Sequence, residues 1–344
     1  MIPAFTSPNQ FLHDPEFEIY EYGQRVDYFE SPQRLRTLLD QLPSSGKVHT
    51  ITAASAVPSQ VTCHSPEYLL FLERIYNQWV SESPQDAGKF GVLYPTAHPI
   101  HKQLSLSTNI PTQLGNYVKD LSAPITSGTY PAAMASAGCA IAAANAILAG
   151  ERLTLALCRP PGHHAGVASA AGYCYINNAA VAATTFRPLG KVAILDIDYH
   201  AGNGTQEIFY EDLNVPVCSI HADPHREYPY FAGFAHETGA GAGLGAHRNL
   251  PLPAGTQPTE YLGALDLACD WLAAHRPTAL VISAGFDTYA QDPLGQFKIT
   301  TPTYTRIGQR IAQLGLPTCV ILEGGYNIPA LPANLLALLN GLSF

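Results

Sequence analysis

Residues 192–200 read Val-Ala-Ile-Leu-Asp-Ile-Asp-Tyr-His, four apolar residues followed by two carboxylates and a histidine. A short apolar run of this kind predicts a buried strand. Polar side chains directly after such a strand are typical of parallel sheets, which bind their ligands at the carboxyl ends of the strands. The segment therefore predicts an α/β protein with a site at one edge of its sheet.

Other segments from about residue 131 onward extend this layout. Further short apolar runs predict strands at Leu153–Cys158, Val215–Ile220, Ala279–Ser283 and Cys319–Leu322, in addition to Val192–Leu195. Helices are expected at Ala132–Leu148, Thr259–Ala274, Thr303–Leu314 and Pro332–Leu339. Apolar strands that alternate with helices favour a multi-stranded, mainly parallel sheet with helices on both faces.

One stretch, residues 81–121, does not follow this pattern. It is rich in Pro, Thr, Gln and His and shows no clear periodicity. A loop of this length inside a compact enzyme is usually functional, as a lid or an oligomer contact. Because the chain has no internal repeat, we expect one domain over residues 1–344, with 81–121 as an insertion at its entrance or dimer contact.

Composition narrows the class of protein. A net charge of −9 argues against a nucleic-acid partner. Seven scattered cysteines without a CxxC motif give no disulfide framework or cysteine metal site. The N-terminal residues lack the features of a signal peptide, and the longest apolar stretch, Ala132–Leu148, contains Ser136 and Asn145. We therefore expect a cytoplasmic protein with no membrane partner, in which this stretch is a buried helix.

Ionisable or metal-binding groups follow all five predicted strands. Asp198 and His200 are two positions apart, so in an extended chain they point to the same side. Asp287, which follows another strand, could complete a set of two carboxylates and one imidazole that leaves a position open for water, as catalytic zinc requires. Alone, an Asp-x-Asp-x-His string could equally be a polar loop.

The neighbouring strand ends supply groups for acid–base chemistry. His163 and His164 follow a Pro-Pro-Gly turn, and imidazole titrates near neutral pH, so one ring can take a proton from water while the other gives one to a leaving amine. Asp196 and Asn203 are candidates to fix the tautomers of these rings. The hydroxyl of Tyr326, after a Gly-Gly pair, could stabilise a developing oxyanion.

These motifs resemble those of the arginase/deacetylase superfamily. The resemblance rests on RPPGHH (159–164), GYCYINNAAVAA (172–183), DIDYHAGNGTQ (196–206), SAGFDTYAQDPLG (283–295) and LEGGYN (322–327). Within the superfamily the chain is most similar to bacterial acetylpolyamine amidohydrolases and class II-type histone deacetylases. The resemblance implies a single-domain arginase/deacetylase fold and zinc-assisted attack of water on an acetamide.

The same resemblance implies a role for individual residues. It assigns Asp198, His200 and Asp287 to one Zn²⁺; His163 and His164 to the acid–base pair, backed by Asp196 and Asn203; Tyr326 to the acetyl carbonyl; Gly172 and Tyr173 to a narrow tunnel that faces Tyr228, Tyr230 or Phe231; and Asp196, Ser219 and Ile220 to a structural K⁺.

The chain also departs from its relatives. A position that carries a glutamate gatekeeper in one polyamine-specific deacetylase is Leu294 here, so another carboxylate must meet a cationic amine. Asp120 is the leading candidate, and the weaker ones are Glu16, Glu18, Glu82 and Asp86. In the polyamine enzymes an insertion near residues 81–115 builds a dimer, so a homodimer is expected here.

The function expected is therefore removal of acetyl groups from small cationic amines, the acetylpolyamines. The alternatives are an acetyl-lysine protein or peptide deacetylase and a broad-specificity amidohydrolase of small acetamides. A two-manganese ureohydrolase would need more Asp and His ligands around the metal motif. A non-catalytic binding protein would be expected to have lost a ligand, a histidine or the tyrosine.

Overall fold

The centre of the computed structural model is an eight-stranded sheet in which every neighbouring pair of strands is parallel. The structure describes residues 1–20, 23–99 and 107–343. The strands are β1 (Ile2–Thr6), β4 (Val48–Thr52), β5 (Leu153–Ala156), β6 (Val192–Asp196), β7 (Val217–Ala222), β8 (His247–Leu252), β9 (Ala279–Ala284) and β10 (Thr318–Leu322). Their order across the sheet is β4-β1-β5-β10-β9-β6-β7-β8, which confirms the predicted fold class.

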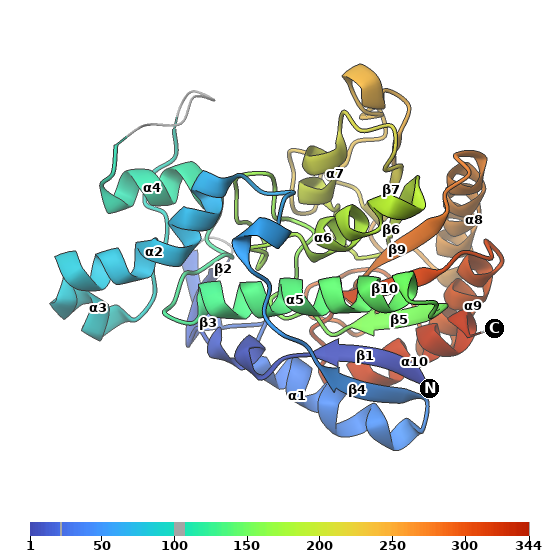
Figure 1. Ribbon diagram of the computed structural model, residues 1–344, viewed down its shortest axis with the longest axis horizontal. Coiled ribbons are helices and arrows are strands. Elements are labelled where there is room, and N and C mark those ends of the chain that lie inside the picture. Colours follow the sequence, from blue (N-terminus) through green and yellow to red (C-terminus); the bar gives the residue numbers. More distant parts are fainter. Residues whose placement is uncertain (21–22, 100–106, 344) are drawn as a thin grey trace.

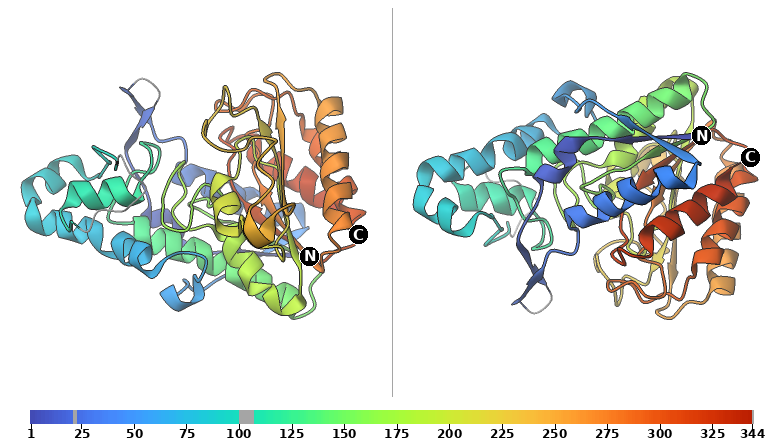
Figure 2. Two further views of the ribbon diagram at one scale, coloured as in Figure 1. Left: turned by 90° about the horizontal axis from the view of Figure 1, so that it is seen from above. Right: turned by 90° about the horizontal axis from the view of Figure 1, so that it is seen from below.

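Helices cover both faces of this sheet (Figures 1 and 2). The described helices are α1 (Pro32–Gln41), α2 (Pro66–Glu82), α3 (Pro84–Phe90), α4 (Ile110–Tyr117), α5 (Thr129–Leu148), α6 (Asn178–Thr185), α7 (Asn203–Phe209), α8 (Pro258–Ala274), α9 (Thr301–Ala312) and α10 (Leu331–Leu342). The four helices predicted from periodicity correspond to α5, α8, α9 and α10.

The alternation of side chains along the strands builds two cores. In β6, Val192 and Ile194 pack into the core beneath α5 and α6, whereas Ala193 and Leu195 pack into the core beneath α8, α9 and α10. Successive side chains of a strand point to opposite faces, so a strand covered on both sides is mainly apolar on both. This is why β5, β6, β7, β9 and β10 were visible in the sequence as mainly apolar runs.

The stretch 81–121 is more regular than its sequence indicates. The end of α2, all of α3 and all of α4 fall within it, so the expectation of a structureless loop was wrong for these parts. Residues 100–106 of the stretch lie outside the described residues. The prolines in this stretch contributed to the prediction of a loop. Those at the start of α3 and α4 occupy the first turn of the helix, where proline is tolerated. Together α2, α3 and α4 form a lobe at one end of the molecule (Figure 2).

The longest apolar helix belongs to the core. By length and composition α5 could cross a membrane, but 67% of its most apolar window is buried inside the protein. It packs against β5, β1 and α6, so the prediction of a buried helix is confirmed.

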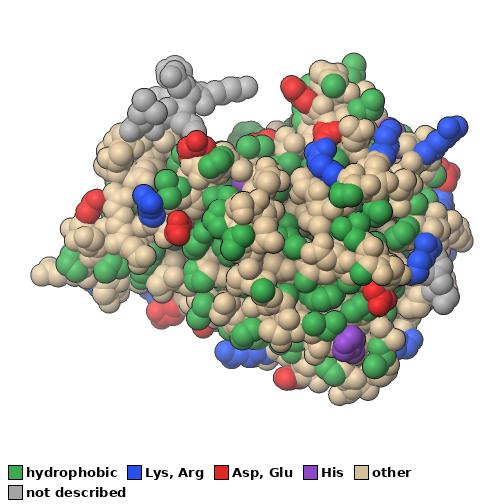
Figure 3. Space-filling model, in the orientation of Figure 1, with side chains coloured by type: hydrophobic (Ala, Val, Ile, Leu, Met, Phe, Trp, Pro, Cys, Tyr) green, Lys and Arg blue, Asp and Glu red, His purple; other side chains and the backbone are tan. Residues whose placement is uncertain are grey.

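The surface and the cysteines agree with the compositional analysis. Acidic side chains on the face seen in Figure 3 are dispersed and do not form one patch. All seven cysteines are buried and unpaired. The net negative charge therefore gives no evidence about a ligand on this face.

A two-stranded hairpin, β2 (Phe17–Tyr20) and β3 (Gln24–Asp27), stands out from the body beside the sheet (Figure 2). It was not expected from the sequence. Its position matters because Ile19 and Tyr20 line the pocket described below.

Candidate active site

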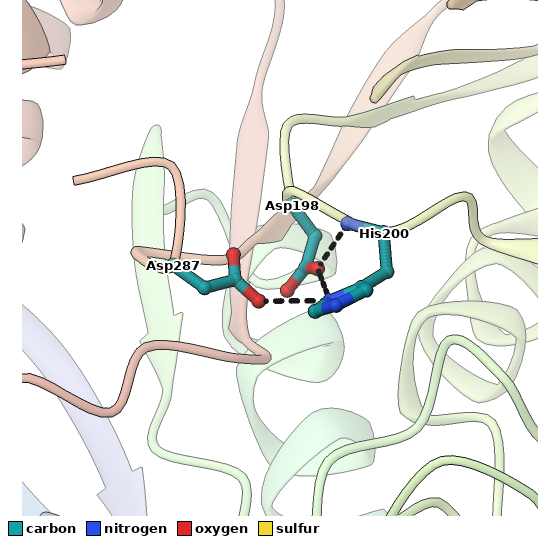
Figure 4. Close-up of side chains that lie close together, drawn as sticks. All are labelled: Asp198, His200 and Asp287. Atoms are coloured by element: carbon teal, nitrogen blue, oxygen red, sulfur yellow. Dashed lines mark hydrogen bonds and ion pairs between the residues drawn. The ribbon is translucent and has the colours of Figure 1, made fainter. Parts of the chain in front are cut away.

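Three side chains that could together hold a metal ion meet at the carboxyl ends of β6 and β9, which are neighbours in the sheet. Asp198 and His200 follow β6, and Asp287 follows β9. One ligand atom of each lies within 4.8 Å of the others, and the side chains point toward one another (Figure 4). His200 Nδ1 is 3.3 Å from Asp198 Oδ1 and 3.1 Å from Asp287 Oδ2.

The charges of this group fit a bound cation. Burial, together with the neighbouring charge of Asp198, raises the pKa of Asp287 to about 7. Burial opposes a charged His200, but hydrogen bonds and charges from Asp198 and Asp287 outweigh it and raise its pKa to about 10. Two buried carboxylates thus draw positive charge to the point between them. Two carboxylates and one imidazole suit Zn²⁺ and leave a coordination position open.

The backbone holds the two carboxylates in place. Asp198 Oδ2 accepts a hydrogen bond from Gly324 N at 2.9 Å, and Asp287 Oδ1 accepts one from Tyr199 N at 2.9 Å. A Cβ at Gly285 would lie 1.9 Å from Asp198 Oδ2, and one at Gly324 would lie 2.4 Å from Asp287 Oδ2. Glycine is required at both positions because the carboxylates lie directly against the main chain.

His163 and His164 lie beside this group, on the turn after β5. Their ring centroids are 4.0 Å apart. His163 Nδ1 is 2.9 Å from Asp196 Oδ2, and His164 Nδ1 is 2.7 Å from Asn203 Oδ1. Since carboxylate and amide oxygens only accept hydrogen bonds, Nδ1 carries the hydrogen in both rings. When His164 is neutral, its Nε2 is therefore a free proton acceptor.

The two rings differ in charge. Burial lowers the pKa of His164 well below its usual value, and the neighbouring His163 and His200 lower it further. Burial also disfavours a proton on His163, but the carboxylates of Asp198 and Asp196 outweigh it and hold its pKa well above the usual value. At neutral pH the pair can therefore accept a proton on one ring while the other ring holds one.

Tyr326, after β10, brings a hydroxyl to the same place. Its ring centroid is 5.7 Å from that of Tyr173, and the guanidinium of Arg34 lies 5.0 Å from the ring centroid. The side chain is partly exposed, and among the described residues its hydroxyl has no hydrogen-bond partner. The hydroxyl is thus free to donate to an oxygen bound in the pocket.

Of these residues, His164, His200 and Tyr326 line one pocket with a volume of ≈ 170 Å³. Its lining comprises Ile19, Tyr20, Ser122, His164, Gly172, Tyr173, His200, Glu227, Tyr228, Tyr230, Leu294 and Tyr326. The volume is below the roughly 300–1,000 Å³ of typical drug-sized ligand sites, so the pocket suits a slender chain. Tyr228 and Tyr230 line it as expected, whereas Phe231 does not and is 91% exposed.

The wall of the pocket at Gly172 depends on the absence of a side chain. Gly172 has φ +50°, and a Cβ there would lie 2.4 Å from His164 Cδ2. Tyr173 follows with φ 66°, an uncommon conformation for a residue with a side chain. The left-handed conformations of Gly172 and Tyr173 let the backbone of the pocket wall lie directly against the imidazole of His164. Strained backbone of this kind is concentrated at functional sites, which indicates that this turn has a functional role.

Asp120 is hydrogen-bonded through its side chain to residues of that pocket wall. Its carboxylate accepts hydrogen bonds from Tyr228 Oη at 2.6 Å, Ser122 N at 2.9 Å and Gly172 N at 3.1 Å. Both of its oxygens are thereby used. The structure thus places this predicted amine-binding residue as the support of three pocket-lining residues, Ser122, Gly172 and Tyr228.

Of the other predicted carboxylates, Glu18 is the one beside the pocket. Glu16, Glu82 and Asp86 are exposed and do not line it. Glu18 is buried and accepts a hydrogen bond from Tyr173 Oη at 3.0 Å, and its Oε2 has no hydrogen-bond partner among the residues that the structure describes. Burial raises its pKa to about 8, although the hydrogen bond from Tyr173 opposes this rise.

Some supporting residues were not identified from the sequence, although they lie in the motifs quoted above. Glu323 Oε2 accepts hydrogen bonds from Gly162 N at 2.7 Å and His163 N at 3.2 Å. Asp292 accepts one from the backbone N–H of Tyr326. A carboxylate inside a glycine-rich turn was the available signal, because such turns expose backbone donors that need acceptors.

The residues predicted to hold K⁺ lie on β6 and β7. Asp196 and Ser219 are partners in the parallel ladder, with Ile220 next in line. Asp196 Oδ1 accepts a hydrogen bond from Asp198 N at 3.0 Å, and Ser219 Oγ is 2.7 Å from His221 Nδ1.

Comparison with known proteins gives consistent matches over the whole chain. A family model described as histone deacetylase domain matches residues 28–342. Acetylpolyamine amidohydrolase 1 of Pseudomonas aeruginosa is 43% identical over 342 residues, covering 97% of each chain. Acetylpolyamine amidohydrolase of Mycoplana ramosa is 39% identical over 341 residues, covering 98% of each.

Solved structures agree with these sequence matches. The crystal structure of acetylpolyamine aminohydrolase from Burkholderia pseudomallei is similar with a TM-score of 0.94 and 37% identity, covering 99% of this chain and 98% of that one. The HDA15 HD domain is similar with a TM-score of 0.79 and 29% identity, covering 99% and 90%.

Proposed function

Because the chain belongs to the histone deacetylase family of amidohydrolases, we propose that it is a zinc-dependent deacetylase of acetylpolyamines. The observation that carries the proposal is that the Asp198–His200–Asp287 group and the two adjacent histidines lie beside one narrow pocket, which His164, His200 and Tyr326 line. The four relatives named acetylpolyamine amidohydrolase, at 38–43% identity, support the choice of substrate.

The protein's own side chains supply the acid–base chemistry. A Zn²⁺ held by Asp198, His200 and Asp287 would polarise the acetyl carbonyl and favour ionisation of water. His164 takes the proton of the attacking water at Nε2, since its Nδ1 hydrogen is engaged by Asn203. His163, held as a cation by its carboxylate neighbours, stabilises negative charge and can give a proton to the leaving amine. The Tyr326 hydroxyl donates to the acetyl oxygen as charge develops on it.

The pocket suits a cationic alkyl chain. Tyr173, Tyr228 and Tyr326 present aromatic surface to the methylenes, and an ammonium near such rings is attracted to their faces. Asp120 supports the pocket wall, so we assign electrostatic attraction of the distal amine to Glu18, a buried carboxylate that does not line the pocket but accepts a hydrogen bond from Tyr173, which does.

Further parts of the proposal concern ions, assembly and location. We propose a K⁺ beside Asp196, Ser219 and Ile220, where the buried carboxylate-bearing end of β6 lies next to Ser219 of β7. We also propose a homodimer built through the lobe that carries α3 and α4 within residues 81–121. A reducing cytoplasm would suit the seven buried thiols.

The second candidate function is deacetylation of acetyl-lysine in a protein or peptide. It is favoured by the match of residues 28–342 to the histone deacetylase domain and by the similarity to the HDA15 domain. A small acetamide hydrolase of broad specificity would use the same groups.

One comparison of substrates tests these functions. Zinc-loaded protein is assayed for acetate release from acetylputrescine, acetylcadaverine, acetylspermidine and an acetyl-lysine peptide, with His164→Ala as the inactive control. The proposal predicts that kcat/KM for the free acetylated amines exceeds that for the peptide. A higher kcat/KM for the peptide would overturn the polyamine assignment, and no turnover of any substrate would overturn the deacetylase assignment.

A further inference from the structure

We infer that Asp292 is a positioning residue that sets the direction of the Tyr326 side chain by holding the peptide bond before it. The inference rests on the proposed role of the Tyr326 hydroxyl. Asp292 does not line the pocket, so it acts through the tyrosine and not on the substrate.

The contacts of Asp292 are unusually complete for a side chain in a loop. It is 6% exposed. Its Oδ2 accepts hydrogen bonds from Tyr326 N at 2.6 Å and Asn327 N at 2.9 Å, and its Oδ1 accepts one from Leu294 N at 3.0 Å. One carboxylate therefore fixes the backbone of two pocket-lining residues, Tyr326 and Leu294, that lie on different segments.

The peptide bond between Gly325 and Tyr326 is held at both ends. Arg34 Nε donates to Gly325 O at 2.8 Å, while Tyr326 N donates to Asp292 at the other end. Arg34 is itself buried and paired with Glu30 at 2.8 Å. Because the peptide unit is planar, fixing its carbonyl and its N–H fixes the orientation of the whole plane. A cation and an anion thus set the direction from which the Tyr326 side chain departs.

The local sequence explains why such a restraint is needed. Gly324 and Gly325 precede the tyrosine, and Gly325 has φ +118°, where a Cβ would lie 2.8 Å from Phe286 Cβ. Glycine is required there, but it leaves the chain free to rotate. A catalytic group displaced by about 1 Å can lose roughly 100-fold in rate. The two hydrogen bonds from consecutive backbone N–H groups to Asp292 remove that freedom.

Asp292→Asn is the informative substitution because it keeps the volume and changes one acceptor into a donor. An ionised carboxylate accepts on both oxygens, whereas an amide accepts on one. Whichever way the amide turns, its NH₂ faces either Leu294 N–H or the N–H groups of Tyr326 and Asn327. Asp212→Asn is the matched control. The Asp212 carboxylate also accepts a backbone hydrogen bond, from Asn214 N at 2.9 Å. Asp212 precedes β7, so it lies at the amino ends of the strands, whereas the pocket lies at their carboxyl ends.

The kinetic test compares these variants on an acetylated diamine. We expect Asp292→Asn to lower kcat by about 10- to 100-fold, with KM within about two-fold and an unchanged zinc content. In a Tyr326→Phe background the same substitution should change kcat by less than about three-fold, because the group it positions is already absent. Asp212→Asn should leave kcat unchanged. An unchanged kcat in Asp292→Asn, or an equal loss in both backgrounds, would overturn the inference.

A second readout does not depend on turnover. With 3-fluorotyrosine placed only at position 326, the ¹⁹F spectrum should show one narrow line in the otherwise unaltered protein and a broadened or split line in Asp292→Asn. An identical narrow line in both proteins would overturn the inference, whether or not the protein has deacetylase activity. A lack of deacetylase activity would by itself count against the proposed function and not against the inference.

If Asp292→Asn does not fold, Asp292→Glu carries the test. This variant keeps the charge, but the longer side chain moves the carboxylate away from its place opposite the backbone N–H groups of Tyr326 and Asn327. It should broaden the ¹⁹F line and lower kcat by about three- to ten-fold, and an unchanged line with an unchanged kcat would overturn the inference.

Discussion

Replacing Tyr326 with phenylalanine separates catalysis from stability more cleanly than other changes in this pocket. The substitution removes one oxygen. The ring keeps its contacts with Tyr173 and with the guanidinium of Arg34. Because no described residue bonds the hydroxyl, its loss leaves no donor or acceptor of the protein without a partner. The free energy of unfolding should therefore change by about 0.5 kcal/mol or less.

The cost should fall on the chemical step. Removing one donor from an oxyanion site typically lowers kcat by about 100- to 1,000-fold, or roughly 2.7–4 kcal/mol of transition-state stabilisation. KM and zinc content should stay nearly unchanged, since neither the ligands nor the aromatic wall is altered. The assay is acetate release from acetylputrescine, with metal analysis and urea denaturation on the same preparations.

Tyr68→Phe is the matched control because it removes a hydroxyl with the opposite role. Tyr68 is fully buried, and its hydroxyl donates to Tyr175 O at 2.7 Å. Its loss should lower the free energy of unfolding by about 1–3 kcal/mol, because it leaves a buried carbonyl oxygen without that donor. The rate should change little. A Tyr326→Phe variant with kcat within ten-fold of the parent, or with a stability loss as large as that of Tyr68→Phe, would refute the assignment of Tyr326.

Three further predictions follow from the site and its supports. Asp287→Ala should lose both zinc and activity, since it removes one of three ligands; a variant with full zinc and normal rate would contradict the ligand set. Arg34→Met should lower the free energy of unfolding in urea by about 3 kcal/mol, because it breaks a buried ion pair with Glu30; a change below about 1 kcal/mol would contradict that role. The pKa of Glu18 is raised to about 8, so its carboxyl group becomes charged as pH rises through that value, whereas a substrate amine with a pKa of about 10.4 stays charged. Between pH 7 and 9, KM for acetylputrescine should therefore fall by up to about ten-fold, while KM for neutral N-butylacetamide should not change. The same pH dependence of KM for both substrates would contradict a role for Glu18 in recognition of the amine.

The parts of the fold that were predictable are those covered on both sides. The inner strands β5, β6, β7, β9 and β10 are buried at every position and mainly apolar, so they were visible as apolar runs. The edge strands β4 and β8 were not, because β4 carries exposed His49 and Thr50, and β8 begins with three polar residues and contains Pro251, which only an edge strand tolerates well. Strand β1 was missed because it contains Pro3, and a proline within an apolar run argues against an inner strand.

The site divides in the same way. Groups placed directly after inner strands, such as Asp198 and Asp287, could be brought together from the sequence because parallel strands end at a common edge. The hydrogen-bond partners of Asp120 and Asp292 could not be predicted from the sequence. Asp120 meets Tyr228, 108 positions away, through the way two loops fold over the pocket. No periodicity records a contact of that kind.

The hairpin β2–β3 has a consequence for how this protein could acquire new substrates. The groups that would break the amide bond are attached to the ends of buried strands, whereas Ile19 and Tyr20 reach the pocket from an element that only borders the body. Reaction and selectivity are thus encoded in separable stretches of the gene. Variation of residues 17–20 and 24–27, combined with selection on longer or uncharged acetamides, offers a route to altered selectivity that leaves the hydrolytic apparatus untouched.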